Sequence, residues 1–326
     1  MKTTPRHWQV LLAICATIAA GWVLLRWIDL TATLAFLRPE NLPGIATASI
    51  FFALVNVVRG VRIARLTTRY VRIPVDVRSG IGLATVTNLA NHVLPLRLGE
   101  LVYVSLSRSV FHVPLAQGAG VLLAMRIYDL VGLIMLALLG LTQAPGLAST
   151  FSVPAFSALA LLLLAVAVRL DLVFATAARV LPGKLAAKLR DALPFTREPR
   201  FVATSLLYAL AIWSVQATAF AVLLRAFGID VGTGPMVVAT SIANLAAVLP
   251  LSALGTFGAQ EAGWTAGFVA MGVSATAAAN SGLAAHLVMV ALNVLMSLAF
   301  VPRLLSRSGA AKSREPAAPL PKHPRP

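Results

Sequence analysis

The chain is built mostly from long apolar stretches separated by short polar segments. A helix that crosses a bilayer needs about 20 consecutive, predominantly apolar residues. Because six stretches have that length, the pattern predicts six transmembrane helices, at residues 8–27, 44–64, 114–140, 153–173, 201–226 and 274–301.

Two further apolar regions, 79–110 and 234–270, are interrupted near their middles by Pro and Gly. Each half is too short to cross a bilayer comfortably, so we expect two re-entrant helical hairpins. Irregular backbone at membrane depth is tolerated only where it is buried in protein or lines a wet cavity. The interruptions carry a repeated phrase, Asn-Leu-Ala-Asn-His-Val-Leu-Pro-Leu-Arg-Leu-Gly-Glu at 88–100 and Asn-Leu-Ala-Ala-Val-Leu-Pro-Leu-Ser-Ala-Leu-Gly-Thr-Phe-Gly-Ala-Gln-Glu at 244–261.

Positive charge is distributed unevenly among the polar segments. Most of the 27 Lys and Arg residues lie before the first predicted span or after the second, fourth and last ones. Arg59 and Arg62, near the end of the second span, are expected to snorkel toward this group. If both hairpins return to the side that they entered from, all four basic segments share one side. The positive-inside rule then predicts a bacterial-type inner-membrane protein with both termini cytoplasmic.

This topology places the two hairpins on opposite sides of the membrane. Segments 44–140 and 201–301 would then form an inverted-topology repeat, which is typical of secondary transporters with a site near the midplane. The predicted fold class is an all-α polytopic membrane protein with one integral membrane domain, 1–305. The basic, Pro- and Ala-rich tail 306–326 is expected to be disordered.

Composition agrees with a membrane protein and argues against a nucleic-acid-binding one. Apolar residues make up 59% of the chain and charged residues 12%, with a mean hydropathy of +0.86, whereas soluble domains are about 25% charged. The net charge of +16 is spread between hydrophobic spans, so we attribute it to membrane orientation rather than to nucleic-acid binding.

A few ionisable residues fall inside the apolar regions, where each charge costs about 2.5–3.5 kcal/mol. Arg97 and Glu100 are three residues apart, as are Arg126 and Asp129, so each pair shares one helix face. Pro95 would start a half-helix whose N-terminus favours a carboxylate or a bound phosphate. Two interpretations stay open: a binding site for an amphiphile headgroup, or a structural network of ion pairs.

The second hairpin contains one carboxylate, Glu261, after Gly258. We expect Glu261 either to pair with Arg97 or Arg126 across the repeat interface or to take up a proton. His286 lies within the last span, where it is either a hydrogen-bonded structural side chain or part of a proton relay. The candidate substrate-binding and translocation residues are Asn91, Pro95, Arg97, Gly99, Glu100, Arg126, Asp129, Asn244, Pro250, Gly258 and Glu261.

The sequence carries no motif of soluble catalysis. It has no P-loop, no nucleophile elbow, no dinucleotide fingerprint and no pairs of Cys or His at metal-binding spacing. Its one cysteine, Cys15, supports neither a disulfide nor a metal cluster. We therefore expect no catalytic residues, no metal and no cofactor.

The interrupted segments resemble the lysylphosphatidylglycerol synthase transmembrane-region family, which is flippase-like. The family motif Asn followed by Leu-Pro-x-Arg-x-Gly-Glu matches here. A second motif, Glu-Arg-x-x-Asp, matches after the hairpin at its Arg and Asp, whereas Met125 stands in place of its Glu. A third region resembles Phe257 to Glu261. The matching residues are Asn91, Leu94, Pro95, Arg97, Gly99, Glu100, Arg126, Asp129, Phe257, Gly258 and Glu261.

The resemblance implies translocation of a lipid between leaflets, with an aminoacylated phosphatidylglycerol as one candidate cargo. The aminoacyl-transferase domain of bifunctional members is expected to be absent, because only about 25 residues follow the last predicted span. An accessory, non-catalytic subunit for a lipid-modifying enzyme or glycosyltransferase is the alternative. An intramembrane enzyme ranks third. Membrane lipids are the expected partners in each case.

Overall fold

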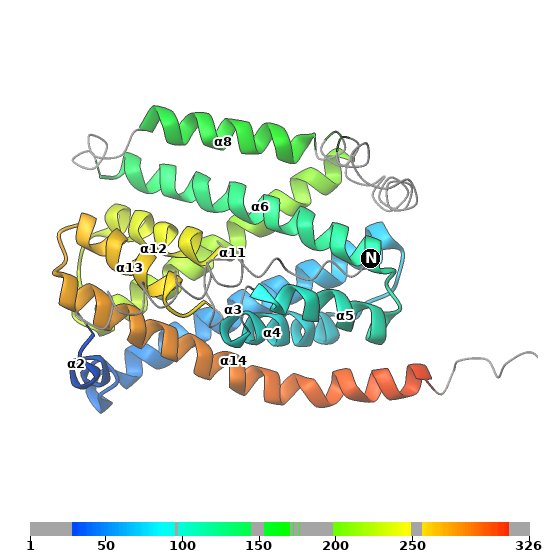
Figure 1. Cartoon of the computed structure of the whole chain (residues 1–326), viewed down its shortest axis with the longest axis horizontal. Helices are drawn as coiled ribbons and strands as arrows, with labels where there is room; N and C mark the ends of the chain where they lie inside the picture. Colours follow the sequence, from blue (N-terminus) through cyan, green and yellow to red (C-terminus); the bar gives the residue numbers. More distant parts are fainter. Residues whose placement is uncertain are drawn as a thin grey trace, which may run out of the picture.

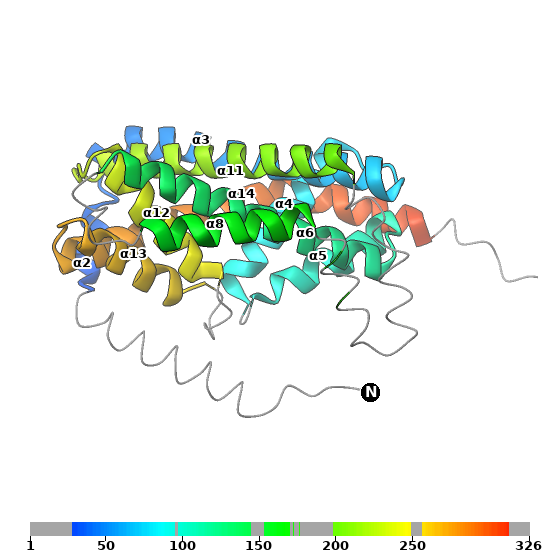
Figure 2. The same cartoon turned by 90° about the horizontal axis from the view of Figure 1, so that it is seen from above.

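A computed structural model describes residues 28–94, 97–144, 153–169, 172, 176, 198–248 and 256–312, and every regular element within these ranges is a helix. The long helices run along the longest axis of the molecule (Figures 1 and 2). The α-helices are α2 (Leu30–Ala35), α3 (Leu42–Leu66), α4 (Val77–Val93), α5 (Gly99–Phe111), α6 (Leu115–Thr142), α8 (Val153–Val168), α11 (Pro199–Ala226), α12 (Thr233–Val248), α13 (Ala259–Ala270) and α14 (Ala275–Lys312). A 3₁₀ turn, Pro39–Asn41, leads into α3, and a π-helical turn, Thr67–Val71, extends it.

Among the described residues, four helices are long and apolar enough to cross a membrane, which supports a multi-pass membrane protein. Their bounds are Pro39–Val71, Leu115–Thr142, Pro199–Ala226 and Ala275–Pro302. These helices cover four of the predicted spans, 44–64, 114–140, 201–226 and 274–301. The predicted span 8–27 lies outside the described residues. The predicted span 153–173 corresponds to α8, a helix of 16 residues.

Each region that was expected to be interrupted forms two short helices rather than one long one. In the first region α4 ends at Val93 and α5 begins at Gly99, and in the second α12 ends at Val248 and α13 begins at Ala259. Proline cannot donate a backbone hydrogen bond and clashes with the preceding turn, which explains the position of both breaks. Pro95 and Pro250 themselves lie outside the described residues.

The two helix pairs lie at opposite ends of the molecule. In both views α12 and α13 occupy one end, α4 and α5 occupy the other, and their interrupted ends point toward the middle (Figures 1 and 2). Helix α4 packs against α14, α12 packs against α6, and α3 packs against α11. Each short pair is therefore enclosed by long helices from the other part of the chain.

Glycines allow these helices to approach one another closely. A Cβ atom on Gly263 would lie 2.5 Å from the Ala246 side chain, and one on Gly267 would lie 2.7 Å from the Ala239 carbonyl oxygen. Small residues four apart, as Gly263 and Gly267 are, let membrane helices pack closely. Helix α13 contacts α12 through these two glycines.

Two apolar clusters surround the middle of the molecule. One includes Leu83 and Tyr128, from α4 and α6, and the other includes Phe220 and Trp264, from α11 and α13. Large apolar side chains are also exposed on the outer faces of α8, α11 and α14, which suits a surface that faces lipid. These exposed side chains include Leu161, Leu207, Leu295 and Leu298.

Candidate functional site

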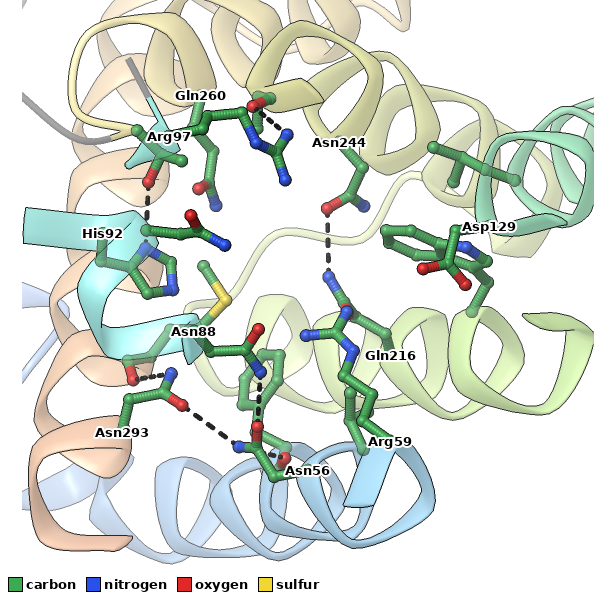
Figure 3. A pocket seen from close by; sticks show the side chains of 18 of the residues that line it. Asn56, Arg59, Asn88, His92, Arg97, Asp129, Gln216, Asn244, Gln260 and Asn293 are labelled. Carbon is green, nitrogen blue, oxygen red and sulfur yellow. Dashed lines mark hydrogen bonds between the residues drawn. The ribbon is translucent and has the colours of Figure 1, made fainter. Parts of the chain in front are cut away.

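A polar cavity of about 120 Å³ lies between the interrupted ends of the helix pairs and the long helices around them (Figure 3). Its lining combines guanidinium groups, one carboxylate, one imidazole and seven carboxamides. Charged side chains are costly inside a largely apolar membrane bundle, and those that occur there usually line a substrate pathway or a water-filled cavity. The polar lining residues are Asn56, Arg59, Asn88, Asn91, His92, Arg97, Arg126, Asp129, Gln216, Asn244, Thr256, Gln260 and Asn293.

The two pairs that were predicted from three-residue spacing lie together at one side of this cavity. They are Arg97 with Glu100 and Arg126 with Asp129. Arg97 Nε is 3.5 Å from Glu100 Oε1, and Arg126 Nε is 2.9 Å from the same oxygen. Arg126 Nη1 also lies 3.8 Å from Asp129 Oδ2. Glu100 therefore links two arginines, and Arg126 links two carboxylates.

A further arginine, Arg62, completes this network. Its Nη2 donates to Asp129 Oδ2 over 3.0 Å, and its Nη1 donates to Asp129 Oδ1. Arg62 is 4% exposed and Asp129 is 5% exposed, so this is a buried bidentate ion pair between α3 and α6. The prediction that Arg62 snorkels to the cytoplasmic surface was wrong. The guanidinium turns inward toward Asp129, a buried carboxylate that another helix, α6, supplies.

Arg59 also turns inward rather than toward the membrane surface. Its Nη2 donates to Gln216 Oε1 over 3.0 Å, and its guanidinium carbon lies 5.8 Å from the Trp213 ring centroid. Gln216 Nε2 in turn donates to Asn244 Oδ1 over 3.0 Å. The expected snorkelling was therefore wrong for Arg59 as well, and a neutral carboxamide is its hydrogen-bond partner.

Arg97 connects the two interrupted helix pairs. It follows the break after α4 with a φ of +57°, a left-handed conformation that is uncommon for residues other than glycine. Its Nη1 donates to the Ala247 carbonyl oxygen near the end of α12 over 2.8 Å. A strained backbone of this kind is typical of functional sites, and here it directs the arginine across the middle of the molecule.

Asn91 and Gly99 hold the first helix pair together at its tip. A Cβ on Gly99 would lie 2.4 Å from Asn91 Oδ1 and 2.5 Å from its backbone nitrogen. This close approach sets the start of α5 against α4 and places Glu100 in the first turn of α5, where the helix dipole favours a carboxylate. Asn91 Oδ1 is buried and has no hydrogen-bond partner among the described residues.

A row of carboxamides forms the opposite wall of the cavity (Figure 3). Asn88 Nδ2 donates to Asn56 Oδ1 over 2.7 Å, and Asn56 Nδ2 donates to Asn293 Oδ1 over 3.3 Å. Sequence reasoning missed this wall, as it missed Gln216 and Gln260. The available signal was the presence of amide side chains within otherwise apolar helices.

Glu261 does not pair with either arginine, so the first of its two expected roles was wrong, whereas uptake of a proton stays a prediction. Its Oε1 pairs with His286 Nδ1, and its Oε2 accepts a hydrogen bond from the Gly258 backbone nitrogen over 2.7 Å. This second contact caps the start of α13, and Gly258 adopts a φ of +87° that favours glycine. Glu261 is 2% exposed and His286 is fully buried.

The predicted site residues therefore separate into three groups. Asn91, Arg97, Arg126, Asp129 and Asn244 line the cavity. Gly99 and Glu100 support this lining, whereas Gly258 and Glu261 lie behind it, at the start of α13. Pro95 and Pro250 lie outside the described residues. Nowhere in the described ranges do three His, Cys, Asp or Glu side chains gather as a metal site would require.

The charges around the cavity do not balance. Arg59, Arg62, Arg97 and Arg126 contribute four guanidinium groups, while Glu100 and Asp129 contribute the only carboxylates that contact them in the described part of the chain. Two positive charges are thus uncompensated at this place. An anion would satisfy them, and the planar fork of arginine suits the oxygens of a phosphate.

Comparison with known proteins gives one match. The model of a family described as the lysylphosphatidylglycerol synthase TM region matches residues 9–297. No curated protein and no solved structure matches the chain.

Proposed function

The chain belongs to the family of the lysylphosphatidylglycerol synthase transmembrane region, and on that premise we propose that it moves a lipid with an anionic headgroup between the leaflets of a membrane. The observation that carries this proposal is the excess, among the described residues, of two guanidinium charges around a polar cavity. The family supports a role in lipid metabolism or transport, and the excess charge supports the headgroup class.

The proposed headgroup contact is a phosphate bound by Arg59 and Arg97. Arg59 contacts only neutral groups among its hydrogen-bond and ring partners, so its charge is not committed to an internal ion pair. Arg97 contacts Glu100 at 3.5 Å and retains a second side of its guanidinium for the cavity. An aminoacylated phosphatidylglycerol carries the same phosphate, and the partly exposed carboxylate of Glu100 is the group that its amino group would meet.

The proposed architecture is six spans and two re-entrant hairpins related as an inverted repeat. Two observations support it. The interrupted ends of the helix pairs approach from opposite ends of the molecule (Figures 1 and 2), and Arg97 meets Ala247 between them. The end of α3, the start of α11 and the end of α14, which carry or adjoin the basic segments, lie at one end (Figure 1). On this basis we place both termini in the cytoplasm of a cell with an inner membrane.

Exchange of labelled lipids in proteoliposomes tests the function. We expect wild-type protein to move labelled phosphatidylglycerol between leaflets faster than labelled phosphatidylcholine, whose headgroup carries no net charge. Replacing Arg59 by Gln should slow phosphatidylglycerol exchange about tenfold, which corresponds to losing about 1.4 kcal/mol of a charge-assisted contact. Arg59→Lys, which keeps the charge but loses the fork, should retain part of the rate.

Arg108→Gln is the matched control, because Arg108 is exposed at the end of α5 and should leave exchange unchanged. Mass spectrometry should recover the lipid chemically unaltered. An equal effect of both substitutions, or headgroup-independent exchange, would contradict the proposed site. If a folded protein moves no lipid, the role of accessory subunit for a lipid-modifying enzyme or glycosyltransferase takes precedence, and altered lipid would indicate an enzyme.

A further inference from the structure

A second cluster of titratable side chains lies behind the cavity and is separate from the arginine network. Glu261 on α13 pairs with His286 Nδ1 on α14. His286 Nε2 lies 3.0 Å from His92 Nδ1 on α4, and Thr256 Oγ1 lies 2.9 Å from the same His92 nitrogen. The result is a continuous chain of hydrogen-bonding groups from a buried carboxylate to a cavity-lining imidazole.

The partners assign a tautomer to each imidazole when the carboxylate is ionised. His286 Nδ1 faces Glu261, so that nitrogen carries the proton and His286 Nε2 is an acceptor. His92 Nδ1 then supplies the hydrogen that His286 Nε2 accepts, which leaves His92 Nε2 without a proton. His92 lines the cavity, and Figure 3 shows it at the cavity wall. The acceptor at the outer end of the chain is thus exposed to the cavity.

Glu261 differs from Glu100 and Asp129 in its surroundings. Glu100 and Asp129 contact guanidinium groups. Glu261 contacts an imidazole and one backbone N–H, with no guanidinium within ion-pair distance among the described residues. Of the three, Glu261 is the carboxylate that a proton can neutralise without leaving a guanidinium group unpaired.

Among the described residues, the cations that act on His92 are Arg59 from α3 and Arg97 after α4, and both line the cavity. Helix α12, which packs against α13, contributes no titratable side chain within Thr233–Val248. On the other side, the Phe257 ring stacks on His286 with centroids 4.0 Å apart. A proton can therefore reach the carboxylate through His92 and the cavity.

We propose that Glu261, His286 and His92 form a proton-binding site that opens into the cavity. A proton from the cavity binds His92 Nε2, the His92 Nδ1 proton passes to His286 Nε2, and the His286 Nδ1 proton passes to Glu261 Oε1. One N–H bond forms and one breaks on each imidazole, and the carboxylate becomes a carboxylic acid. Both imidazoles end neutral in the opposite tautomer, so one proton is taken up and the buried negative charge disappears.

Proton uptake at this site would also provide an energy source for transport, an inference that rests on the proposed function. Binding an anionic headgroup next to Arg59 and Arg97 lowers the positive potential at His92, which favours uptake of a proton through the chain. Lipid movement and proton movement would then be coupled. The proton site itself does not depend on which lipid is moved, or on whether lipid is moved at all.

Histidine NMR tests the site without any lipid substrate. In protein labelled with ¹⁵N-histidine, we expect the His92 and His286 signals to change tautomer together as the pH falls. Glu261→Gln should move the midpoint of that change to lower pH by about one unit or more, because the proton must then remain on an imidazole. His112, which is exposed at the end of α5, is the internal reference: at each pH its signal should be the same in wild type and in Glu261→Gln.

Infrared difference spectroscopy can be carried out on the wild-type protein, so its result does not depend on whether a variant folds correctly. Acidification should produce a protonated-carboxyl band together with the histidine change, and Glu261→Asp should displace that band. The proposal is overturned if the His92 signals do not change at the pH at which the carboxyl band appears and are the same in wild type and in the Glu261 variants. Glu261 would then be only a helix cap.

Proteoliposomes containing a trapped pH dye separate this proposal from the proposed function. Coupling predicts that phosphatidylglycerol exchange moves protons in wild type and responds to a pH gradient, and that Glu261→Gln abolishes both the proton movement and the response to the gradient. Exchange without a linked histidine and carboxyl titration would contradict the proton site alone. A linked titration in a protein that moves no lipid would support the proton site and contradict the transport function.

Discussion

Replacing Asp129 by Ala is expected to destabilise the folded protein by about 3–5 kcal/mol, the usual cost of breaking a buried ion pair from one side. Asp129 accepts two hydrogen bonds from Arg62, and both residues are almost completely buried. Removing the carboxylate leaves a buried guanidinium without its partner and removes one of the two carboxylates that contact Arg126. Thermal unfolding in detergent, followed by tryptophan fluorescence, should report this loss as a large fall in Tm.

A double substitution distinguishes an uncompensated charge from lost packing. Arg62→Met combined with Asp129→Leu removes both charges while filling similar volume, and it should recover most of the lost stability. Glu100→Gln is the milder comparison, because the Glu100 side chain is 32% exposed. We expect it to lower the Tm by well under half of the decrease that Asp129→Ala causes. If the double variant is as unstable as Asp129→Ala, the pair stabilises the fold through packing rather than through charge compensation.

Gly60→Ala is expected to cost about 3 kcal/mol or more, at or above the upper end of ordinary overpacking. A Cβ on Gly60 would lie 2.4 Å from Ile81 Cα and 2.5 Å from Ile81 nitrogen. The obstacle is backbone, so no rotation of a side chain relieves the clash, and α3 and α4 must move apart. Because α3 carries Arg59 and α4 carries His92, the cavity lining should also shift, and the yield of monodisperse protein should fall.

Gly118→Ala on α6 is the matched control for this effect. The nearest side-chain atom to its Cβ would be 3.6 Å away, which is an ordinary contact. Its stability should change by no more than about 0.5 kcal/mol. Equal Tm values for the Gly60 and Gly118 variants would mean that the crossing of α3 and α4 is looser than the structure indicates.

The two results together bear on how the site is built. The Gly60 contact sets the distance between α3 and α4, and the Arg62–Asp129 pair joins α3 to α6. Arg97 then joins the tip of the first helix pair to α12. Charged groups that would be costly separately in a membrane are therefore held by contacts between helices that are far apart in the chain.

The sequence by itself determined the features that depend on neighbouring residues. Hydropathy predicted the four long helices, because a span is defined by a continuous run of apolar side chains. Proline and glycine predicted the interruption of both 79–110 and 234–270. The three-residue spacing of Arg126 with Asp129 predicted a contact that the helical repeat of α6 imposes. Arg97 also contacts Glu100, but it precedes α5 in a left-handed conformation, so the turn before the helix brings the two together rather than a shared helix face.

The tertiary structure alone decided which groups the helices turn toward the interior. A helix that is apolar all round has no polar stripe to orient it, so nothing local told Arg59 and Arg62 to face the cavity rather than the membrane surface. The pairing of Glu261 with His286 and the carboxamide wall likewise join residues from different helices. Partners of buried polar groups are chosen by helix packing, since each group takes the nearest hydrogen-bonding side chain that the fold brings to it.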